Sequence, residues 1–317
     1  MKKGAFFIAT LTMVIMLPSW LHNGPVSAEL LKKRLPDYNV DVSTLPPSKS
    51  GVTVVFDLHG VLLGHDKRKG IDELGAGNIA KYIAKHCTLH IQPALLKKTY
   101  EIYNVIQKEG NFGGSHDPFG NLMPGIMCDW QCGRKTNAQL LDIVSCAMEQ
   151  HPEWFSSAVE KRMIEHVVKK MFIPQLMIST IFLVSEGLEY VRHCKERGHT
   201  VCVLSNWDSE SFELLMKKYP ELFILVDGVI VSGVIKHMKP EPGAYDSLVR
   251  RQQKHKEIIV FVDDQKENSD AASACGLNGF HYVERAGFLG LASRTNFQAI
   301  DQYITYLLAQ ENTKNFR

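Results

Sequence analysis

Five side chains suited to catalysis stand at the ends of three apolar runs of the sequence. They are Asp57, Ser205, Asn206, Asp263 and Asp264. A carboxylate such as Asp57 can attack a phosphorus centre and split hydrolysis into two displacements through an aspartyl-phosphate. The paired carboxylates of Asp263 and Asp264 offer the hard oxygen ligands that Mg²⁺ prefers. These residue types therefore predict metal-assisted chemistry at a phosphate group.

A magnesium ion held by these acids needs an octahedron of oxygen ligands. The expected protein ligands are Asp57, the main-chain carbonyl of His59, and Asp263 or Asp264, and water and a phosphate oxygen complete the set. The metal then neutralises the nucleophile and the substrate together, which would otherwise repel each other.

The transferring phosphate oxygens also need hydrogen-bond donors and positive charge. The Ser205 hydroxyl and the Asn206 amide are the expected donors, and Lys239 is the expected cation. Each residue has a simpler structural explanation: Asp264 as a helix N-cap, Ser205 and Asn206 as turn residues, and Lys239 as a surface lysine. Convergence of these residues at one sheet edge favours the functional interpretation.

The elements that must position these residues alternate between strand and helix patterns. Strands are expected at residues 52–56, 201–204, 229–231, 258–262 and 279–282, and helices from Ser185, from Asp208, and at 242–253 and 268–275. Such alternation predicts an α/β fold with a doubly wound parallel sheet. In these sheets ligands bind at the carboxyl ends of the strands, where the five side chains fall.

Helical patterns without strands fill the stretch between residues 64 and 177, and we interpret them as an inserted α-helical cap. The expected helices cover residues 76–86, 93–108, 137–149 and 156–171. The loop at residues 112–119 is a candidate for substrate selection, because its glycines allow movement. The predicted organisation is a signal peptide (1–28), a lead-in segment (29–50), a core (51–65 and 178–310) and a cap (66–177).

Four short motifs in this order resemble those of the haloacid dehalogenase (HAD) superfamily, in the subgroup with a helical cap inserted after the first motif. They lie at residues 54–62, at residues 203–206, at residues 239–242 with Tyr245, and at residues 261–264 followed by Asn268, Ala271, Ala272 and Gly276. The resemblance implies a Rossmann-like core and a Mg²⁺-dependent phosphatase acting on a small phosphorylated substrate. It also implies that Asp57, His59 and Lys239 carry the chemistry.

His59 departs from the pattern of the phosphatases in this superfamily, which usually have a second aspartate two residues after the nucleophile. That aspartate protonates the leaving group and later activates water. A histidine can do both jobs near neutral pH, so we expect His59 to be the acid and base. The alternative is a passive replacement, which leaves a slow enzyme or one that stalls at the aspartyl-phosphate.

Two other functions stay open at this point. A carbon–halogen hydrolase would use the same aspartate without Mg²⁺, but such enzymes usually lack the acid pair found at Asp263 and Asp264. A catalytically silent binding or effector protein could retain the fold after losing its acid–base residue. Mg²⁺-dependent turnover of an aryl phosphate separates the three functions.

The first 28 residues have the order of a secretory signal. Lys2 and Lys3 precede an apolar run, and the small residues Val26, Ser27 and Ala28 form a cleavage site. We therefore expect an exported, periplasmic or secreted protein with no membrane contact after cleavage. Beyond residue 28 there are 34 basic and 34 acidic side chains, so charge gives no case for a nucleic-acid partner.

Seven cysteines, an odd number, all lie beyond residue 28 and cannot be fully paired within one chain. A disulfide scaffold is therefore not expected. Cys128 and Cys132 have the spacing of zinc ligands, but no second pair or spaced histidines accompany them. Substrate identity and oligomeric state leave no pattern that we can interpret.

Overall fold

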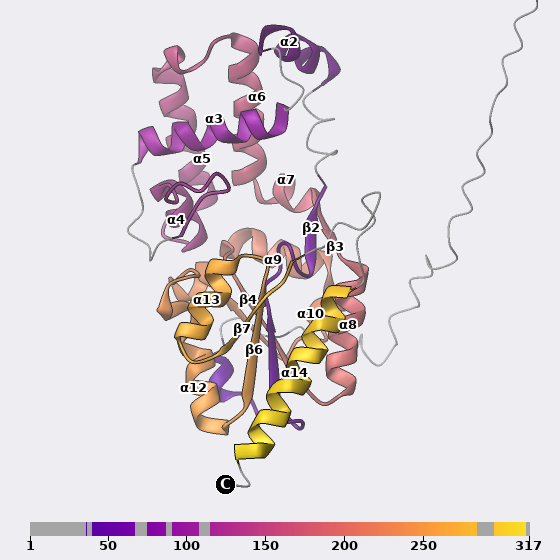
Figure 1. Cartoon of the computed structure of the whole chain (residues 1–317). Helices are drawn as coiled ribbons and strands as arrows, with labels where there is room; N and C mark the ends of the chain where they lie inside the picture. Colours follow the sequence, from indigo (N-terminus) through magenta and orange to yellow (C-terminus); the bar gives the residue numbers. More distant parts are fainter. Residues whose placement is uncertain are drawn as a thin grey trace, which may run out of the picture.

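The computed structural model describes residues 36, 40–66, 75–86, 91–107, 115–283 and 295–314. Five parallel strands form one sheet in the order β5-β4-β1-β6-β7 (Figure 1). Their bounds are Val52–Phe56 (β1), Thr200–Ser205 (β4), Gly228–Val231 (β5), Ile258–Asp263 (β6) and Asn278–His281 (β7). The predicted α/β fold with a parallel sheet is confirmed.

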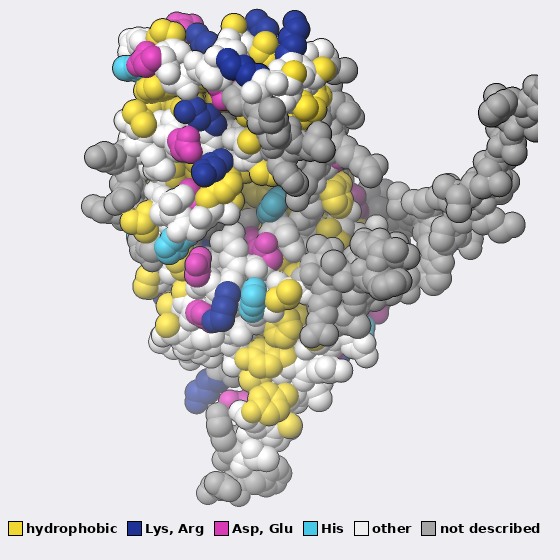
Figure 2. All heavy atoms as spheres, turned by 45° about the horizontal axis from the view of Figure 1, so that its top comes forward, with side chains coloured by type: hydrophobic (Ala, Val, Ile, Leu, Met, Phe, Trp, Pro, Cys, Tyr) yellow, Lys and Arg dark blue, Asp and Glu magenta, His cyan; other side chains and the backbone are white. Residues whose placement is uncertain are grey.

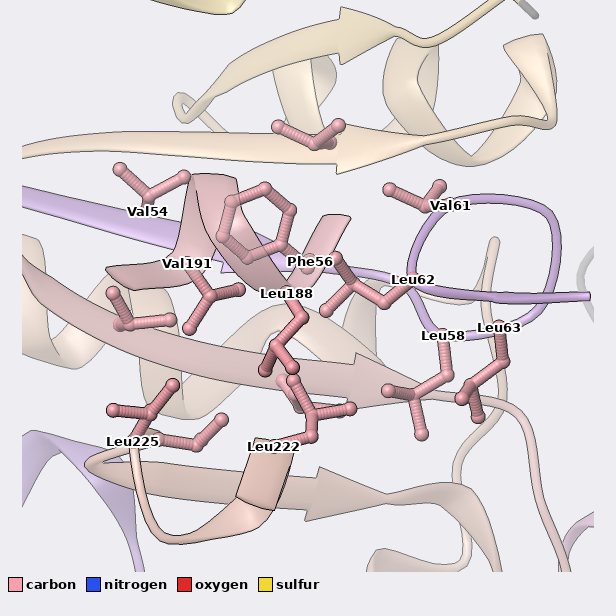
Figure 3. Packing of buried hydrophobic residues seen from close by; sticks show 14 of the residues in the cluster. Val54, Phe56, Leu58, Val61, Leu62, Leu63, Leu188, Val191, Leu222 and Leu225 are labelled. Carbon is pink, nitrogen blue, oxygen red and sulfur yellow. The ribbon is translucent and has the colours of Figure 1, made fainter. Parts of the chain in front are cut away.

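Helices cover both faces of this sheet, and its central strands are therefore buried on both sides. One face packs against α8 (Ser185–Glu196), α9 (Ser209–Lys218), α10 (Pro220–Phe223) and α14 (Thr295–Lys314). Val54 and Phe56 of β1 point into this layer with Leu188 and Val191 of α8 (Figure 3).

The opposite face of the sheet, which carries Val55, packs against other helices. They are η2 (Val42–Thr44), η4 (Pro242–Tyr245), α12 (Asp246–His255) and α13 (Lys266–Ala274). The helix expected at residues 242–253 is thus a 3₁₀ turn followed by an α-helix, and α14 was not predicted. The sheet is doubly wound, as the alternation of strands and helices indicated.

A second hydrophobic core lies in the helical part between residues 75 and 179 (Figure 1). Its elements are α2 (Ala76–His86), α3 (Ile91–Ile106), α4 (Gly125–Gln131), α5 (Asn137–Gln150), η3 (Pro152–Trp154), α6 (Ala158–Phe172) and α7 (Pro174–Ser179). No strand occurs among the described residues of this part. The arrangement is compatible with the expected inserted cap.

A short two-stranded sheet joins the two parts of the chain, and the sequence did not predict it. β2 (Leu63–His65) pairs antiparallel with β3 (Ile181–Leu183), so the chain enters the helical part along β2 and leaves it along β3. Three-residue strands carry too little alternation to be seen in a sequence. The four-residue helix α11 (Ser232–Ile235) follows β5 and was also not predicted.

The fold begins before Gly51, where the sequence analysis placed its start. Val42 in η2 is fully buried in the layer with Val55 of β1. The lead-in segment is therefore anchored on the sheet by Val42.

The expected signal peptide (residues 1–28), Cys87 and the first three residues of the predicted selection loop (residues 112–114) lie outside the described residues. None of the described helices is long and apolar enough to cross a membrane.

The expected export of the protein stays a prediction. The other six cysteines are free thiols.

Candidate active site

Asp57 and Asp263 are brought side by side by the pairing of β1 with β6. Phe56 lies opposite Val262 in the parallel ladder, and the Asp57 N–H donates to the Val262 carbonyl at 2.8 Å. Asp57 and Asp263 therefore come directly after Phe56 and Val262, which are paired residues of the two neighbouring strands. Both side chains are buried.

Lys239 lies between these two carboxylates. Its Nζ is 2.9 Å from Asp57 Oδ1 and 2.6 Å from Asp263 Oδ2, and only 1% of the residue is exposed. Burial lowers the pKa of Lys239, but Asp263 and Asp57 outweigh burial and raise it, so the ammonium stays charged. The interpretation of Lys239 as a solvated surface residue is therefore wrong.

Asn206 holds the backbone of Lys239 in place. Its Oδ1 accepts from the Lys239 N–H at 2.8 Å, and its Nδ2 donates to the Lys239 carbonyl at 2.9 Å. This amide therefore positions the lysine backbone, and its expected role at the phosphate stays a prediction. Ser205 ends β4 as a buried residue next to it, and its expected role stays a prediction.

Asp263 is fixed by donors as well as by Lys239. Its Oδ1 accepts from the Gln265 N–H at 2.8 Å and from Asn268 Nδ2 at 3.0 Å. The Tyr245 hydroxyl donates to the Asn268 carbonyl at 2.8 Å. Asn268 and Tyr245, which the sequence showed only as parts of motifs, thus orient a carboxylate of the site.

Asp264 completes a cluster of three acids. One carboxylate oxygen from each of Asp57, Asp263 and Asp264 lies within 4.8 Å of the others. Asp264 Oδ1 is buried without a hydrogen-bond partner among the described residues. Burial, with the charges of Asp57 and Asp263, raises the pKa of Asp264 to about 7. The cluster has three carboxylates for one ammonium, and one carboxylate oxygen lacks a donor, so the set fits a hard cation.

Gly60 allows the turn after Asp57 to pass close to this cluster. Its φ is +87°, and a Cβ at this position would lie 2.3 Å from Asp264 Oδ2. Any side chain would therefore be strained and would displace the carboxylate. Gly60 is therefore a structural requirement of the site.

His59 is exposed and lines a cavity of about 420 Å³ between the sheet and the helical part. The remaining wall comes from β2, α3, α4, α6, α7 and β3. Figure 2 shows hydrophobic side chains in the hollow on this side of the molecule, with a histidine and an acidic side chain near them. The expected role of His59 as acid and base stays a prediction.

The described part of the predicted selection loop does not line this cavity. Within it, His116 Nδ1 lies 3.7 Å from Glu267 Oε1 of α13, and the Phe119 ring packs on Tyr100 of α3. The loop therefore ties the helical part to the core. The cavity wall belongs mainly to helices, which had no sequence motif to mark them.

Sequence comparison identifies relatives of the chain. Residues 52–276 match the family of haloacid dehalogenase-like hydrolases. The sesquiterpene phosphatase astK of Aspergillus oryzae is 29% identical over 94 residues, which are 30% of this chain and 47% of that protein. The chain thus spans about half the length of the curated relative that it matches.

Solved structures to which the chain is similar include an enzyme of the HAD family and a dehalogenase. A HAD family enzyme of Bacteroides thetaiotaomicron has a TM-score of 0.44 and 17% identity, and the match covers 74% of this chain and 94% of that one. The L-2-haloacid dehalogenase of Xanthobacter autotrophicus has a TM-score of 0.39 and 11% identity, with coverage of 71% and 74%. Because the family match spans well over half of its residues, this chain belongs to the haloacid dehalogenase-like hydrolases.

Proposed function

We propose that this protein is a Mg²⁺-dependent phosphatase that hydrolyses phosphate monoesters through an aspartyl-phosphate on Asp57. The observation that carries the proposal is the cluster of Asp57, Asp263 and Asp264, in which Lys239 pairs with the first two and one oxygen of Asp264 has no partner among the described residues. A carbon–halogen hydrolase has no use for three acids that hold a cation. The similarity to a sesquiterpene phosphatase over part of the chain agrees with phosphate chemistry.

The residues that would hold Mg²⁺ are Asp57, Asp263 or Asp264, and the main-chain carbonyl of His59. Once bound, the ion supplies positive charge that screens the phosphate from the nucleophile. Lys239 brings a second positive charge to the same place, because Asn206 and Asp263 fix both its backbone and its ammonium. Positive charge placed in advance stabilises the transition state more than the ground state.

The reaction then takes two displacements. An Asp57 carboxylate oxygen attacks phosphorus, the bond from phosphorus to the ester oxygen breaks, and His59 gives its proton to the departing alkoxide. Water next attacks the aspartyl-phosphate, His59 takes a proton from that water, and the bond between phosphorus and Asp57 breaks. The products are an alcohol and inorganic phosphate, and both residues return to their starting states.

The test measures turnover of 4-nitrophenyl phosphate against Mg²⁺ concentration for the wild type and for Asp57→Asn. We expect wild-type turnover only with Mg²⁺, and loss of nearly all turnover in Asp57→Asn, because an amide is a poor nucleophile and a weak Mg²⁺ ligand. Circular dichroism checks that the variant is folded. Metal-independent turnover, or a variant as active as the wild type, would refute the proposal, and release of halide from a 2-haloacid would support the dehalogenase instead.

A further inference from the structure

The cavity that His59 lines is large enough to hold an organic group. Its volume of about 420 Å³ falls in the range of about 300–1,000 Å³ typical of small-molecule sites. His59, which lines the cavity, follows the nucleophile Asp57 by two residues, so the cavity lies beside the turn that carries the nucleophile. It is therefore the candidate space for the organic group of a phosphate ester bound at Asp57.

Apolar atoms make up most of the cavity wall. The apolar side chains that line it include Leu95 and Leu96 of α3, Val167 and Met171 of α6, Met177 of α7, and Ile181 of β3. Four of them, namely Leu96, Val167, Met171 and Met177, are only partly buried. Covering such surface is favourable in proportion to the apolar area removed from water.

The wall also carries polar side chains, among them Gln92, Gln131 and Lys170, but apolar atoms predominate, so a sugar would find partners for only part of its hydroxyls. Each hydroxyl that leaves water needs a hydrogen-bond partner, and an unpaired one costs more than its contacts return. An alkyl or prenyl chain needs no partner. The three methionines of the wall, at positions 127, 171 and 177, are flexible and polarisable, and they can pack against chains of different shape.

We propose that the substrate is the monophosphate ester of a long apolar alcohol, whose hydrocarbon chain occupies this cavity. This inference rests on the proposed phosphatase function and specifies its substrate class. Hydrolysis of the ester consumes one water molecule and releases the apolar alcohol and inorganic phosphate.

The experiment compares kcat/KM for ethyl, butyl, hexyl and octyl phosphate with kcat/KM for glucose 6-phosphate. Burial of each methylene group is expected to raise kcat/KM about fourfold until the cavity is filled. The hydrocarbon chain of the substrate is held in the same way in the ground state and in the transition state. The increase in kcat/KM therefore comes from a lower KM, with little change in kcat. Glucose 6-phosphate is expected to be a poorer substrate than hexyl phosphate.

Leu96→Trp narrows the cavity, and Val105→Trp is its matched control. Both residues belong to α3, but Val105 is 65% exposed and does not line the cavity. We expect the ratio of kcat/KM for octyl over ethyl phosphate to fall at least about tenfold in Leu96→Trp. Val105→Trp should keep the wild-type ratio.

The outcomes are distinguishable. A rising series in the wild type with a lowered ratio in Leu96→Trp supports the inference. A flat series, or a preference for glucose 6-phosphate, overturns it but leaves the phosphatase function standing. Absence of turnover with every ester, 4-nitrophenyl phosphate included, overturns the proposed function and this inference with it. The wild-type series decides the matter even where the tryptophan variant fails to fold.

Discussion

Lys239 is the residue on which the charge balance of the site depends. It carries one positive charge between Asp57 and Asp263, and Asp264 adds a third carboxylate with a buried oxygen that no donor among the described residues satisfies. Two of these acids have a raised pKa because burial and mutual repulsion oppose their ionisation. A divalent cation would restore the balance, so Asp264 is the acid whose removal should act most directly on metal affinity.

We predict that Asp264→Asn raises the Mg²⁺ concentration needed for half-maximal turnover at least about tenfold, because an amide lacks the charge that binds a hard cation. Titration calorimetry with MgCl₂ should show the same weakening without any substrate. Asp270→Asn is the control, since Asp270 is an exposed residue of α13 that pairs with Lys266. Equal Mg²⁺ affinity in wild type and Asp264→Asn would remove Asp264 from the metal site.

His59→Ala tests the proposed acid and base through the leaving group. General acid catalysis contributes about 10²–10⁴-fold, so turnover of an alkyl phosphate should fall by about that factor. Turnover of 4-nitrophenyl phosphate should fall less, because nitrophenolate scarcely needs a proton. His193→Ala, at an exposed histidine of α8, is the control. Losses that are the same for both esters would mean that His59 does not transfer the proton.

At the scale of elements, α12 ties the lead-in segment to the sheet through Arg251. This fully buried side chain pairs with Glu257, with Nε 3.0 Å from Oε2. It also donates to the carbonyls of Val42 at 3.0 Å and Pro46 at 2.9 Å. The lead-in segment, which has no apolar periodicity, is thus held by the buried Arg251 guanidinium. A buried guanidinium requires hydrogen-bond acceptors, and the Val42 and Pro46 carbonyls of this segment supply two of them.

We predict that Arg251→Ala lowers the free energy of unfolding by about 3–5 kcal/mol, because it leaves Glu257 charged and buried without its partner. Urea denaturation followed by circular dichroism measures the change. The neighbouring Arg250→Ala is a matched control, since Arg250 is exposed and pairs with Asp41 at the surface. Its expected cost is about 0–1 kcal/mol. Similar costs for both variants would contradict the network.

At the scale of the whole molecule, Asn137 at the start of α5 joins the helical part to the core. Its Nδ2 donates to Asp208 Oδ1 at 2.7 Å, and its Oδ1 accepts from Trp130 Nε1 at 2.8 Å. Asp208 is the N-cap of α9, and Trp130 lines the cavity. Ser232 Oγ adds a second link by donating to the Gln131 carbonyl at 2.6 Å.

We predict that Asn137→Ala speeds amide hydrogen exchange in α4 and α5 while leaving exchange in β1 and β6 unchanged. The variant leaves the Trp130 N–H and Asp208 without this partner, which costs about 1–3 kcal/mol and acts on the contact between the two parts. Gln150→Ala, at the exposed end of the same helix, serves as the control. Faster exchange across the whole sheet would show that Asn137 supports global stability instead.

The parallel sheet, and the position of Asp57 and Asp263 at the carboxyl ends of its strands, could be predicted from local sequence patterns. The short β-branched runs that end at Asp57 and Asp263 are local patterns of the sequence. Parallel neighbouring strands always have their carboxyl ends at the same edge of the sheet, so these two acids are expected to meet. The chemical roles given to these residues stay predictions.

The support of the site and the cavity beside His59 are visible only in the tertiary structure. The Asn206 amide meets Lys239 across 33 positions of sequence, and Arg251 reaches Val42 across 209. The wall of the cavity comes from separate helices whose apolar residues look like ordinary core positions in the sequence. Contacts between distant residues leave no periodicity in a sequence, because they depend on how complete elements pack and not on the order of neighbouring residues.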